Sequence, residues 1–488
     1  MDTYQLNFTG LLGLCAALFV AQRRTPAQPK QDAKSAGSKK DSKPKQKADS
    51  NEASQWPFLV VFALVMGSDW LQARLHIHSP RSQPLRAQKA NLSTQGPFLY
   101  SLYREEHGVS SGMVSTLFTT GFLSGAVSAY ATGTLADRHG RRLACLAFCA
   151  AYGLSCALTM APSLPLLFAG RVLGGVGTSL LFSVFESWMV TDFHARGLGA
   201  KGGDLSRTFG VMSTLNSVVA IASGVFSEWV VSASGTRKAP FAAAVALLAV
   251  ASWVIATRWE ENYGDSAKTN KTEKADGGEG EEAPRPKLWD MLKDPRIVCL
   301  GLSSTMFEGS MYLFVFMWGP ALQSAHAYES AAASSGAGAA GLPYGIIFAS
   351  FMASVLAASL LFNIAMDNKL LRYTYLLGGI LAAADLVFYL LEQPRSEQLT
   401  FWLFCLFEAC VGMYWPCMGY LKGQLIDDGV RAQLYGILRV PLNVFVVVSL
   451  YFTGDGDSYA TVFAVCSRLL LLSMGALYAM VMNEDELP

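Results

Sequence analysis

Apolar segments of about 20 residues, the length that a membrane-spanning helix requires, recur along the whole chain. Polar stretches separate them. The segments cover residues 5–21, 57–72, 112–133, 142–161, 164–190, 209–231, 240–257, 297–322, 343–365, 373–391, 399–421, 434–453 and 459–482. This pattern predicts an all-α, polytopic membrane protein with thirteen transmembrane helices.

Two longer polar stretches divide the segments into one, six and six. Residues 23–56 are expected to form a Lys-rich flexible linker and residues 259–295 a cytoplasmic linker. The remaining domains are an N-terminal transmembrane helix (1–22), an N-terminal six-helix bundle (57–258) and a C-terminal six-helix bundle (296–483). The first segment could instead be a cleaved signal peptide. We favour a retained anchor, because residues 1–8 lack a basic leader and no small-residue cleavage site precedes Arg23.

The composition supports a membrane protein. The chain has 488 residues, of which 52% are hydrophobic and 15% charged, and its mean hydropathy is +0.30, which is too apolar for an ordinary soluble domain. A net charge of +1 gives no field that would attract nucleic acid. The nine cysteines sit in apolar runs without metal-ligand spacing and read as small buried hydrophobes. We expect no metal, no cofactor and no enzymatic activity.

Lysine and arginine gather in alternate loops, as they do on the cytoplasmic side of membrane proteins. The loops after the second, fourth, sixth, eighth and tenth core helices carry them, whereas "APSLP" and "TGDGDS" carry none. Three exceptions, Arg237, Lys238 and Arg395, lie on the other side. Both ends of the twelve-helix core are therefore predicted to face the cytoplasm, and the leading helix to begin outside.

The first core helix is interrupted. It reads "FLVVFALVMGSDWLQ", then passes into a basic, proline-containing stretch at 73–95 before "GPFLYSLY" resumes. Joining Gln72 to Gly96 would give one helix of normal length, whereas the insert would strand polar backbone at membrane depth. We hypothesise that 73–95 is translated intron or a lineage-specific loop, which the sequence of the transcript would decide.

The two sets of six helices share a short internal similarity. "FESWM" is followed about 20 residues later by "FGVMSTLN", and "FEACV" is followed at a similar distance by "YGILRVPLN". The fourth and fifth helices of each set therefore read as copies, which is typical of transporters built from structural repeats.

The loop "GTLADRHGRR" (133–142) resembles the signature of the major facilitator superfamily. The resemblance implies a conformational gate, and its members here are Gly133, Asp137, Arg138, Gly140, Arg141 and Arg142. Asp137 would accept hydrogen bonds from helix-terminal amides or pair with an arginine across the interface between the halves. The alternative is a plain basic turn. "GRVLGGVG" resembles the fourth-helix motif of the superfamily and adds Arg171 to the gate, unless this arginine only reaches toward the membrane interface.

Further blocks point to a narrower family. "DWLQ" joined to "GPFLYSLY", together with "LFSVFESW", "FEGSMYLFVFMWGP", "GIIFASFMAS" and "LRVPLN", resembles the eukaryotic molybdate-anion transporter family of that superfamily. The resemblance extends over most of the chain. It implies a major facilitator fold of two six-helix bundles plus one extra N-terminal transmembrane helix.

Four carboxylates interrupt apolar helices: Asp69, Glu186, Glu308 and Glu408. A charge at mid-membrane costs about 2.5–3.5 kcal/mol on insertion scales and usually marks a polar path. The resemblance implies that their four helices line the central cavity. Each acid could instead be structural and bonded to a neighbouring Ser, Tyr or Trp.

An anion path also needs donors. Arg439 precedes Pro441 in an apolar helix and offers a planar fork that fits tetrahedral oxyanions. Asn216 and Asn443, at matching places in the repeats, would donate amide hydrogens without adding charge. We hypothesise that Arg439 holds a dianion while the acids take up protons.

The leading interpretation is a secondary active transporter of the plasma membrane that imports molybdate by alternating access, with protons as the second partner and the lipid bilayer as its surroundings. There is no nucleotide-binding glycine loop that would indicate direct use of ATP. Two alternatives stay open: a proton-coupled carrier of an organic or other small polar solute, and a non-transporting membrane sensor or scaffold.

Overall fold

The computed structural model describes residues 3–24, 45–72, 102–198, 204–264, 291–332, 342–367, 372–393, 395–427, 430–452 and 459–483. Over these residues the chain forms thirteen long α-helices and one short π-helix, η1. Each predicted transmembrane segment coincides with one long helix, so the predicted all-α architecture is confirmed. Eleven of the helices are long and apolar enough to cross a membrane.

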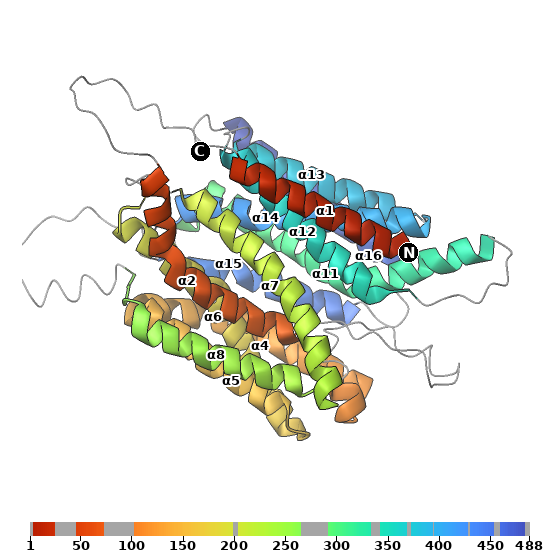
Figure 1. Ribbon diagram of the computed structural model, residues 1–488, viewed down its shortest axis with the longest axis horizontal. Helices are drawn as coiled ribbons and strands as arrows, with labels where there is room; N and C mark the ends of the chain where they lie inside the picture. Colours follow the sequence, from red (N-terminus) through yellow and green to blue (C-terminus); the bar gives the residue numbers. More distant parts are fainter. Residues whose placement is uncertain are drawn as a thin grey trace, which may run out of the picture.

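The helices form two bundles of six, with one helix ahead of them. The first helix is α1 (Thr3–Arg24), and the N-terminal bundle consists of α2 (Lys45–Gln72), α4 (Ser111–His139), α5 (Arg141–Thr159), α6 (Leu164–Ala195), α7 (Leu205–Ser234) and α8 (Ala239–Arg258), with η1 (Leu102–Glu106) before α4. The C-terminal bundle consists of α11 (Pro295–Ala332), α12 (Tyr344–Asp367), α13 (Tyr373–Leu391), α14 (Glu397–Leu425), α15 (Arg431–Phe452) and α16 (Tyr459–Asn483). In Figure 1 the N-terminal bundle occupies the lower half of the view and the C-terminal bundle the upper half.

The helix α1 packs on the C-terminal bundle, although the N-terminal bundle follows it in sequence (Figure 1). The Tyr4 hydroxyl donates to Glu397 Oε1 at 2.5 Å, Asn7 Nδ2 donates to Gln398 Oε1 at 3.0 Å, and the Cys15 thiol donates to the carbonyl of Ala353 at 3.2 Å. The first turn of α1 therefore lies beside the first turn of α14. That end of α14 is the end that the loop charges assign to the outside, in agreement with the predicted orientation of α1.

The loops predicted to be cytoplasmic meet at one end of the molecule. The amide of Arg141 donates to the carbonyl of Asn262 at 2.9 Å, and Gln433 at the start of α15 donates to Asp137. At the other end, Glu106 contacts the loop that carries Arg237 and Lys238, two of the three exceptions to the loop-charge pattern. Lys238 Nζ lies 3.6 Å from Glu106 Oε1. This carboxylate offsets charge on the side where cations are disfavoured.

The bundles contact each other mainly through four helix pairs: α4 with α15, α7 with α12, α7 with α14, and α6 with α15. At Gly436 of α15, an added Cβ would overlap the carbonyl of Ala129 in α4. At Gly210 of α7, it would overlap the side chain of Asn363 in α12. Gly210 and Gly436 are the second residues of the repeated "FGVMSTLN" and "YGILRVPLN" stretches. Glycine leaves room for the facing backbone at Gly436 and for the Asn363 side chain at Gly210.

Two stretches predicted as linker are ordered. Helix α2 begins at Lys45, inside the predicted flexible linker at 23–56, because its first turns are rich in helix-forming Lys, Gln, Ala and Glu. Residues 259–264 lie against the N-terminal bundle, where the indole of Trp259 stacks on Trp188 with 3.9 Å between ring centroids. The anomalous insert at 73–95 lies outside the described residues. On either side of it, Leu71 and Leu102 belong to one buried cluster.

All nine cysteines are free and buried, as predicted for small apolar side chains.

Candidate functional site

A buried carboxylate at the inner face of α11 is the centre of the candidate site. Glu308 is 1% exposed, and its Oε1 accepts hydrogen bonds from the hydroxyls of Ser304 at 2.6 Å and Tyr414 at 3.1 Å. Two cations flank it: Arg439 NH1 lies 3.5 Å from Oε2, and Lys422 Nζ lies 3.9 Å from Oε1. We call these five residues the Glu308 cluster. They come from α11, α14 and α15 of the C-terminal bundle.

The cluster faces the other bundle. The guanidinium carbon of Arg439 lies 3.8 Å from the centroid of the Phe182 ring, which belongs to α6. Phe182 also stacks on Trp415 of α14, with 6.2 Å between centroids. A cation on an aromatic face is held in place without a counter-charge. Arg439 therefore lies at the interface between the bundles, where a passing solute could reach it.

Glu186 approaches the same region from α6. Its Oε1 is buried and has no hydrogen-bond partner within the described residues, and the hydroxyl of Tyr435 lies beside the carboxyl. Lys422, Arg431 and Glu308 lie within electrostatic range of it. A buried polar atom without a partner costs about 1–3 kcal/mol, so this carboxyl is poised for a ligand, a water molecule or a proton.

The other predicted path residues are more dispersed. The Tyr152 hydroxyl donates to Asp69 Oδ1 at 2.5 Å, which ties this acid to α5 inside the N-terminal bundle. Asn216 accepts a hydrogen bond from Trp70 Nε1 at 2.9 Å, so its oxygen is already engaged. The structure therefore gives Asp69 and Asn216 partners within their own bundle.

Glu408 and Asn443 are each 8% exposed. Glu408 shares a helical stripe of α14 with Gly412, where an added Cβ would lie 2.4 Å from the carbonyl oxygen of Val355 in α12, so the acid lies on the side of α14 that packs on α12. Asn443 packs beside Gly125 of α4. None of the four predicted acids is exposed on the lipid-facing surface.

Sequence reasoning missed Lys422 as a site residue. This lysine counts in the loop pattern as a cytoplasmic charge, yet its ammonium donates to Ser304 Oγ at 3.1 Å inside the bundle. Its flexible stem lets the charged group reach away from its own backbone position. The signal available in the sequence was the position of Lys422 directly after the predicted apolar segment 399–421.

The signature loop joins the two bundles at the predicted cytoplasmic end. Asp137 Oδ2 accepts the backbone N–H of Gln433, in the first turn of α15, at 2.9 Å, while Oδ1 accepts Arg141 Nε at 2.9 Å and NH2 at 2.7 Å. The arginine lies in the same bundle, and the contact across the interface is the helix-terminal amide. Arg141 is fully buried and also donates to Thr191 of α6. The carboxylate thus complements the positive end of α15.

Glycine and arginine complete this junction. A Cβ at Gly133 would lie 2.5 Å from the carbonyl oxygen of Ala432, so only glycine fits there. Gly140 has φ +115°, and the carboxylate of Glu261 occupies the space of its absent side chain. Glu261 accepts the N–H groups of Arg142 at 2.7 Å and Leu143 at 3.1 Å, which caps α5.

The two remaining arginines of the predicted gate lie apart from this junction. Arg138 is exposed. Arg171 lies in the half of α6 that begins outside, with its guanidinium 5.9 Å from the Tyr103 ring centroid and its Nε buried without a hydrogen bond. The motif "GRVLGGVG", which contains Arg171, therefore lies close to η1 and α5 rather than to the signature loop.

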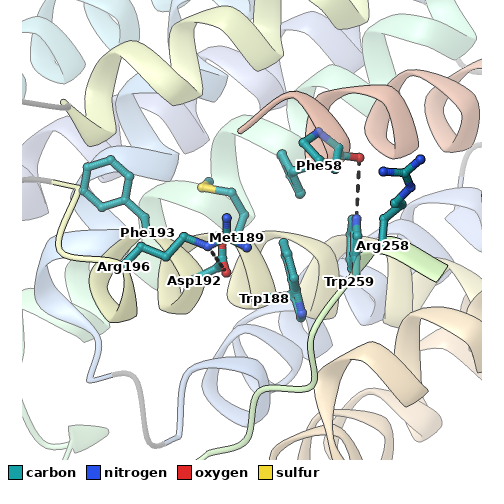
Figure 2. A pocket seen from close by; sticks show the side chains of 9 residues that line it. Phe58, Trp188, Met189, Asp192, Phe193, Arg196, Arg258 and Trp259 are labelled. Atoms are coloured by element: carbon teal, nitrogen blue, oxygen red, sulfur yellow. Dashed lines mark hydrogen bonds and ion pairs between the residues drawn. The ribbon is translucent and has the colours of Figure 1, made fainter. Parts of the chain in front are cut away.

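A cavity of about 90 Å³ opens beside the end of α6 (Figure 2). Phe58, Trp188 and Trp259 form one wall, and Arg258 lies at its edge. Arg196, also in its lining, is bonded to Asp192 at 2.8 Å. The cavity includes none of the predicted path residues, so the candidate site is the Glu308 cluster with Glu186.

Comparison with known proteins identifies the family of this chain. Residues 89–405 match the family model MFS_5, described as sugar transporters with twelve transmembrane segments. The molybdate-anion transporter of Xenopus tropicalis is 31% identical over 80% of this chain and 84% of its own. That of Danio rerio is 28% identical over 99% of this chain and 97% of its own.

A solved structure shares the fold. The crystal structure of the human organic anion transporter MFSD10 (TETRAN) superposes with a TM-score of 0.55, covering 89% of this chain and 100% of its own, at 14% identity. The similarity to this structure concerns the fold, and the sequence relatives are named as transporters. The chain therefore belongs to the molybdate-anion transporter family of the major facilitator superfamily.

Proposed function

We propose that this transporter imports molybdate across the plasma membrane by alternating access, coupled to protons. The observation that carries the proposal is the position of Arg439 and Lys422 on either side of Glu308, at the interface between the bundles. Two cations in one buried place suit a small dianion. The names of the relatives give the anion its identity.

The carboxylate acts as an internal counter-ion. In the unloaded carrier Glu308 balances one of the two cations beside it. An arriving dianion meets the same two cations and repels the ionised carboxylate, because like charges at short range disfavour the charged form. Uptake of a proton by Glu308, with Glu186 as a second acceptor nearby, removes the repulsion. The loaded site then carries little net charge, which lowers the cost of moving it through the membrane interior.

The signature loop supplies the gate. Asp137 and Gly133 hold the ends of α4 and α15 together at the predicted cytoplasmic side, which suits a conformation closed to the cytoplasm. Opening to that side requires the Asp137–Gln433 bond to break. Gly140, Arg141 and Arg142 position Asp137, and Arg171 is assigned to the outer half of the path.

The test is uptake of molybdate, measured as cellular molybdenum by mass spectrometry, in cells without their own uptake system. Arg439→Ala should lower uptake by about tenfold or more, as expected when one partner of a buried charge pair is removed. Glu186→Gln should lower uptake and flatten its increase at acidic external pH. Arg196→Ala, at an exposed arginine directly after α6, is the matched control.

The outcomes separate the parts of the proposal. Absence of uptake by the wild-type protein would reject molybdate as substrate. Normal uptake by both Arg439→Ala and Glu186→Gln, with wild-type amounts of protein in the membrane, would reject these residues as the path.

A second candidate is a carrier of a neutral solute, because the matching family model is described as sugar transporters. The aromatic pair Phe182 and Trp415 beside the site would suit a sugar ring. Inhibition of molybdate uptake by tungstate but not by hexoses would favour the oxyanion. A membrane sensor that transports nothing remains the third interpretation, and uptake after removal of residues 25–44 and 265–290 would argue against it.

A further inference from the structure

Both cations of the Glu308 cluster interact with the carboxylate, each with a different oxygen. Arg439 faces Oε2 of the carboxylate at 3.5 Å, and Lys422 faces Oε1 at 3.9 Å. They come from different helices, α15 and α14, so the carboxylate lies between them. Its side chain is 2% exposed, and those of Lys422 and Arg439 are 16% and 11% exposed.

The remaining groups around the carboxylate do not distinguish anions by charge. Ser304 and Tyr414 are neutral hydroxyls that can donate to any oxyanion. Arg431 donates through NH1 to the carbonyl of Gly423 at 3.0 Å, and its electrostatic partner in the site is Glu186. Glu186 is the other acid within electrostatic range of Lys422.

We infer that Lys422 makes the site selective for tetrahedral oxyanions of charge −2 over those of charge −1. This inference rests on the proposed function, since it assumes that an oxyanion replaces Glu308 between the cations. A dianion then neutralises both Lys422 and Arg439. A monoanion leaves one buried cation unpaired unless Glu308 stays ionised, and an unpaired buried charge is strongly disfavoured.

Molybdate and perrhenate test this selectivity, because both are tetrahedral MO₄ anions of similar size and differ by one unit of charge. Cells are given an equimolar mixture, and molybdenum and rhenium are counted in the same sample by mass spectrometry. The ratio of the two metals is independent of the amount of protein in the membrane. It therefore reports selectivity rather than expression.

Lys422→Gln and Glu308→Gln should move the molybdenum-to-rhenium ratio in opposite directions. Lys422→Gln removes one cation and should lower the molybdenum-to-rhenium ratio by about tenfold or more, which corresponds to about 1.4 kcal/mol of differential binding. Lys422→Arg keeps the charge and should keep the ratio. Glu308→Gln should raise the ratio, because a monoanion then has no carboxylate to help balance the two cations. Lys293→Gln, at an exposed lysine before α11, should leave the ratio unchanged.

A ratio that is the same in Lys422→Gln as in the wild type would overturn the inference while leaving molybdate transport intact. If Lys422→Gln does not reach the membrane, Glu308→Gln provides the test instead. A molybdenum-to-rhenium ratio that is the same in Glu308→Gln as in the wild type would also overturn the inference. Uptake of neither metal by the wild type would instead remove the proposed function.

Discussion

At Gly133 the backbone of α4 lies directly against the first turn of α15. A methyl group there would come within 2.5 Å of the Ala432 oxygen and 2.7 Å of the Gln433 Cα, both of them backbone atoms that cannot rotate away. Gly133→Ala should therefore push the bundles apart at the predicted cytoplasmic end, at a cost of about 1–3 kcal/mol typical of overpacking.

The measurement is labelling of Thr191→Cys, beside Arg141, by a membrane-impermeant thiol reagent added to inside-out vesicles. Labelling should be faster in the Gly133→Ala background. Gly379→Ala is the control, because Gly379 has no atom within 4 Å of an added Cβ. Equal labelling rates in all three backgrounds would mean that Gly133 does not hold the closed form.

Single residues also show how far the sequence could go. Glu308 and Arg439 were predicted as path residues because a charge inside an apolar helix is conspicuous, and they lie 3.5 Å apart. The participation of Lys422 depends on the direction of a long side chain, which the sequence does not encode locally. The same holds for Asp69, whose partner Tyr152 is 83 residues away.

Among the elements, helix positions followed from hydrophobic length alone, whereas helix neighbours did not. The α1 segment gives no indication of its partner, because most of its residues are apolar on every side. Its docking on α12 and α14 depends on polar groups at one end, Tyr4 and Asn7, that meet residues of α14. The order at 45–56 was missed for another reason: a polar, helix-forming composition resembles that of a flexible linker.

The start of α11 offers a prediction for one element. Asp294 precedes the helix, and its Oδ1 accepts the N–H of Arg296 at 2.9 Å, as an N-cap residue does. Hydrogen bonding to Arg296 lowers the pKa of Asp294 below its usual range. Because the folded pKa is the lower one, the stabilisation is fully present above the unfolded pKa of about 3.9 and is lost as pH falls through the folded pKa.

Asp294→Ala should cost about 1 kcal/mol at the first turn of α11. Amide hydrogen exchange of residues 296–299 at neutral pH should be about fivefold faster. Asp294→Asn keeps an acceptor oxygen but loses the charge that pairs with Arg296, so its effect should be intermediate, and Lys293→Ala serves as the neighbouring control. The difference in melting temperature between wild type and Asp294→Ala in detergent should shrink as pH falls through the lowered pKa of Asp294, and a constant difference there would contradict the role of the ionised cap.

The whole molecule consists of two units whose internal contacts differ from the contacts between them. Within the N-terminal bundle, α4 and α6 meet at Ser128 and Ser179, whose hydroxyl oxygens are 3.3 Å apart. Across the bundle interface, α7 and α12 meet at Thr214 and Ser359, whose hydroxyl oxygens are 3.2 Å apart. Transport by alternating access requires the second contact to change while the first persists.

Disulfide cross-links at these two places give a matched test of that requirement. The variant Thr214→Cys with Ser359→Cys, once oxidised, should lose nearly all molybdate uptake and recover it after reduction, because the link joins the two bundles. Ser128→Cys with Ser179→Cys, linked over almost the same distance, should keep most of its uptake because both positions move together. The nine native cysteines are buried, which limits their exchange with the new pair. Full uptake by the oxidised Thr214–Ser359 pair, with the link verified by mass spectrometry, would mean that α7 and α12 do not separate during transport, and a bundle-rocking mechanism would then be wrong.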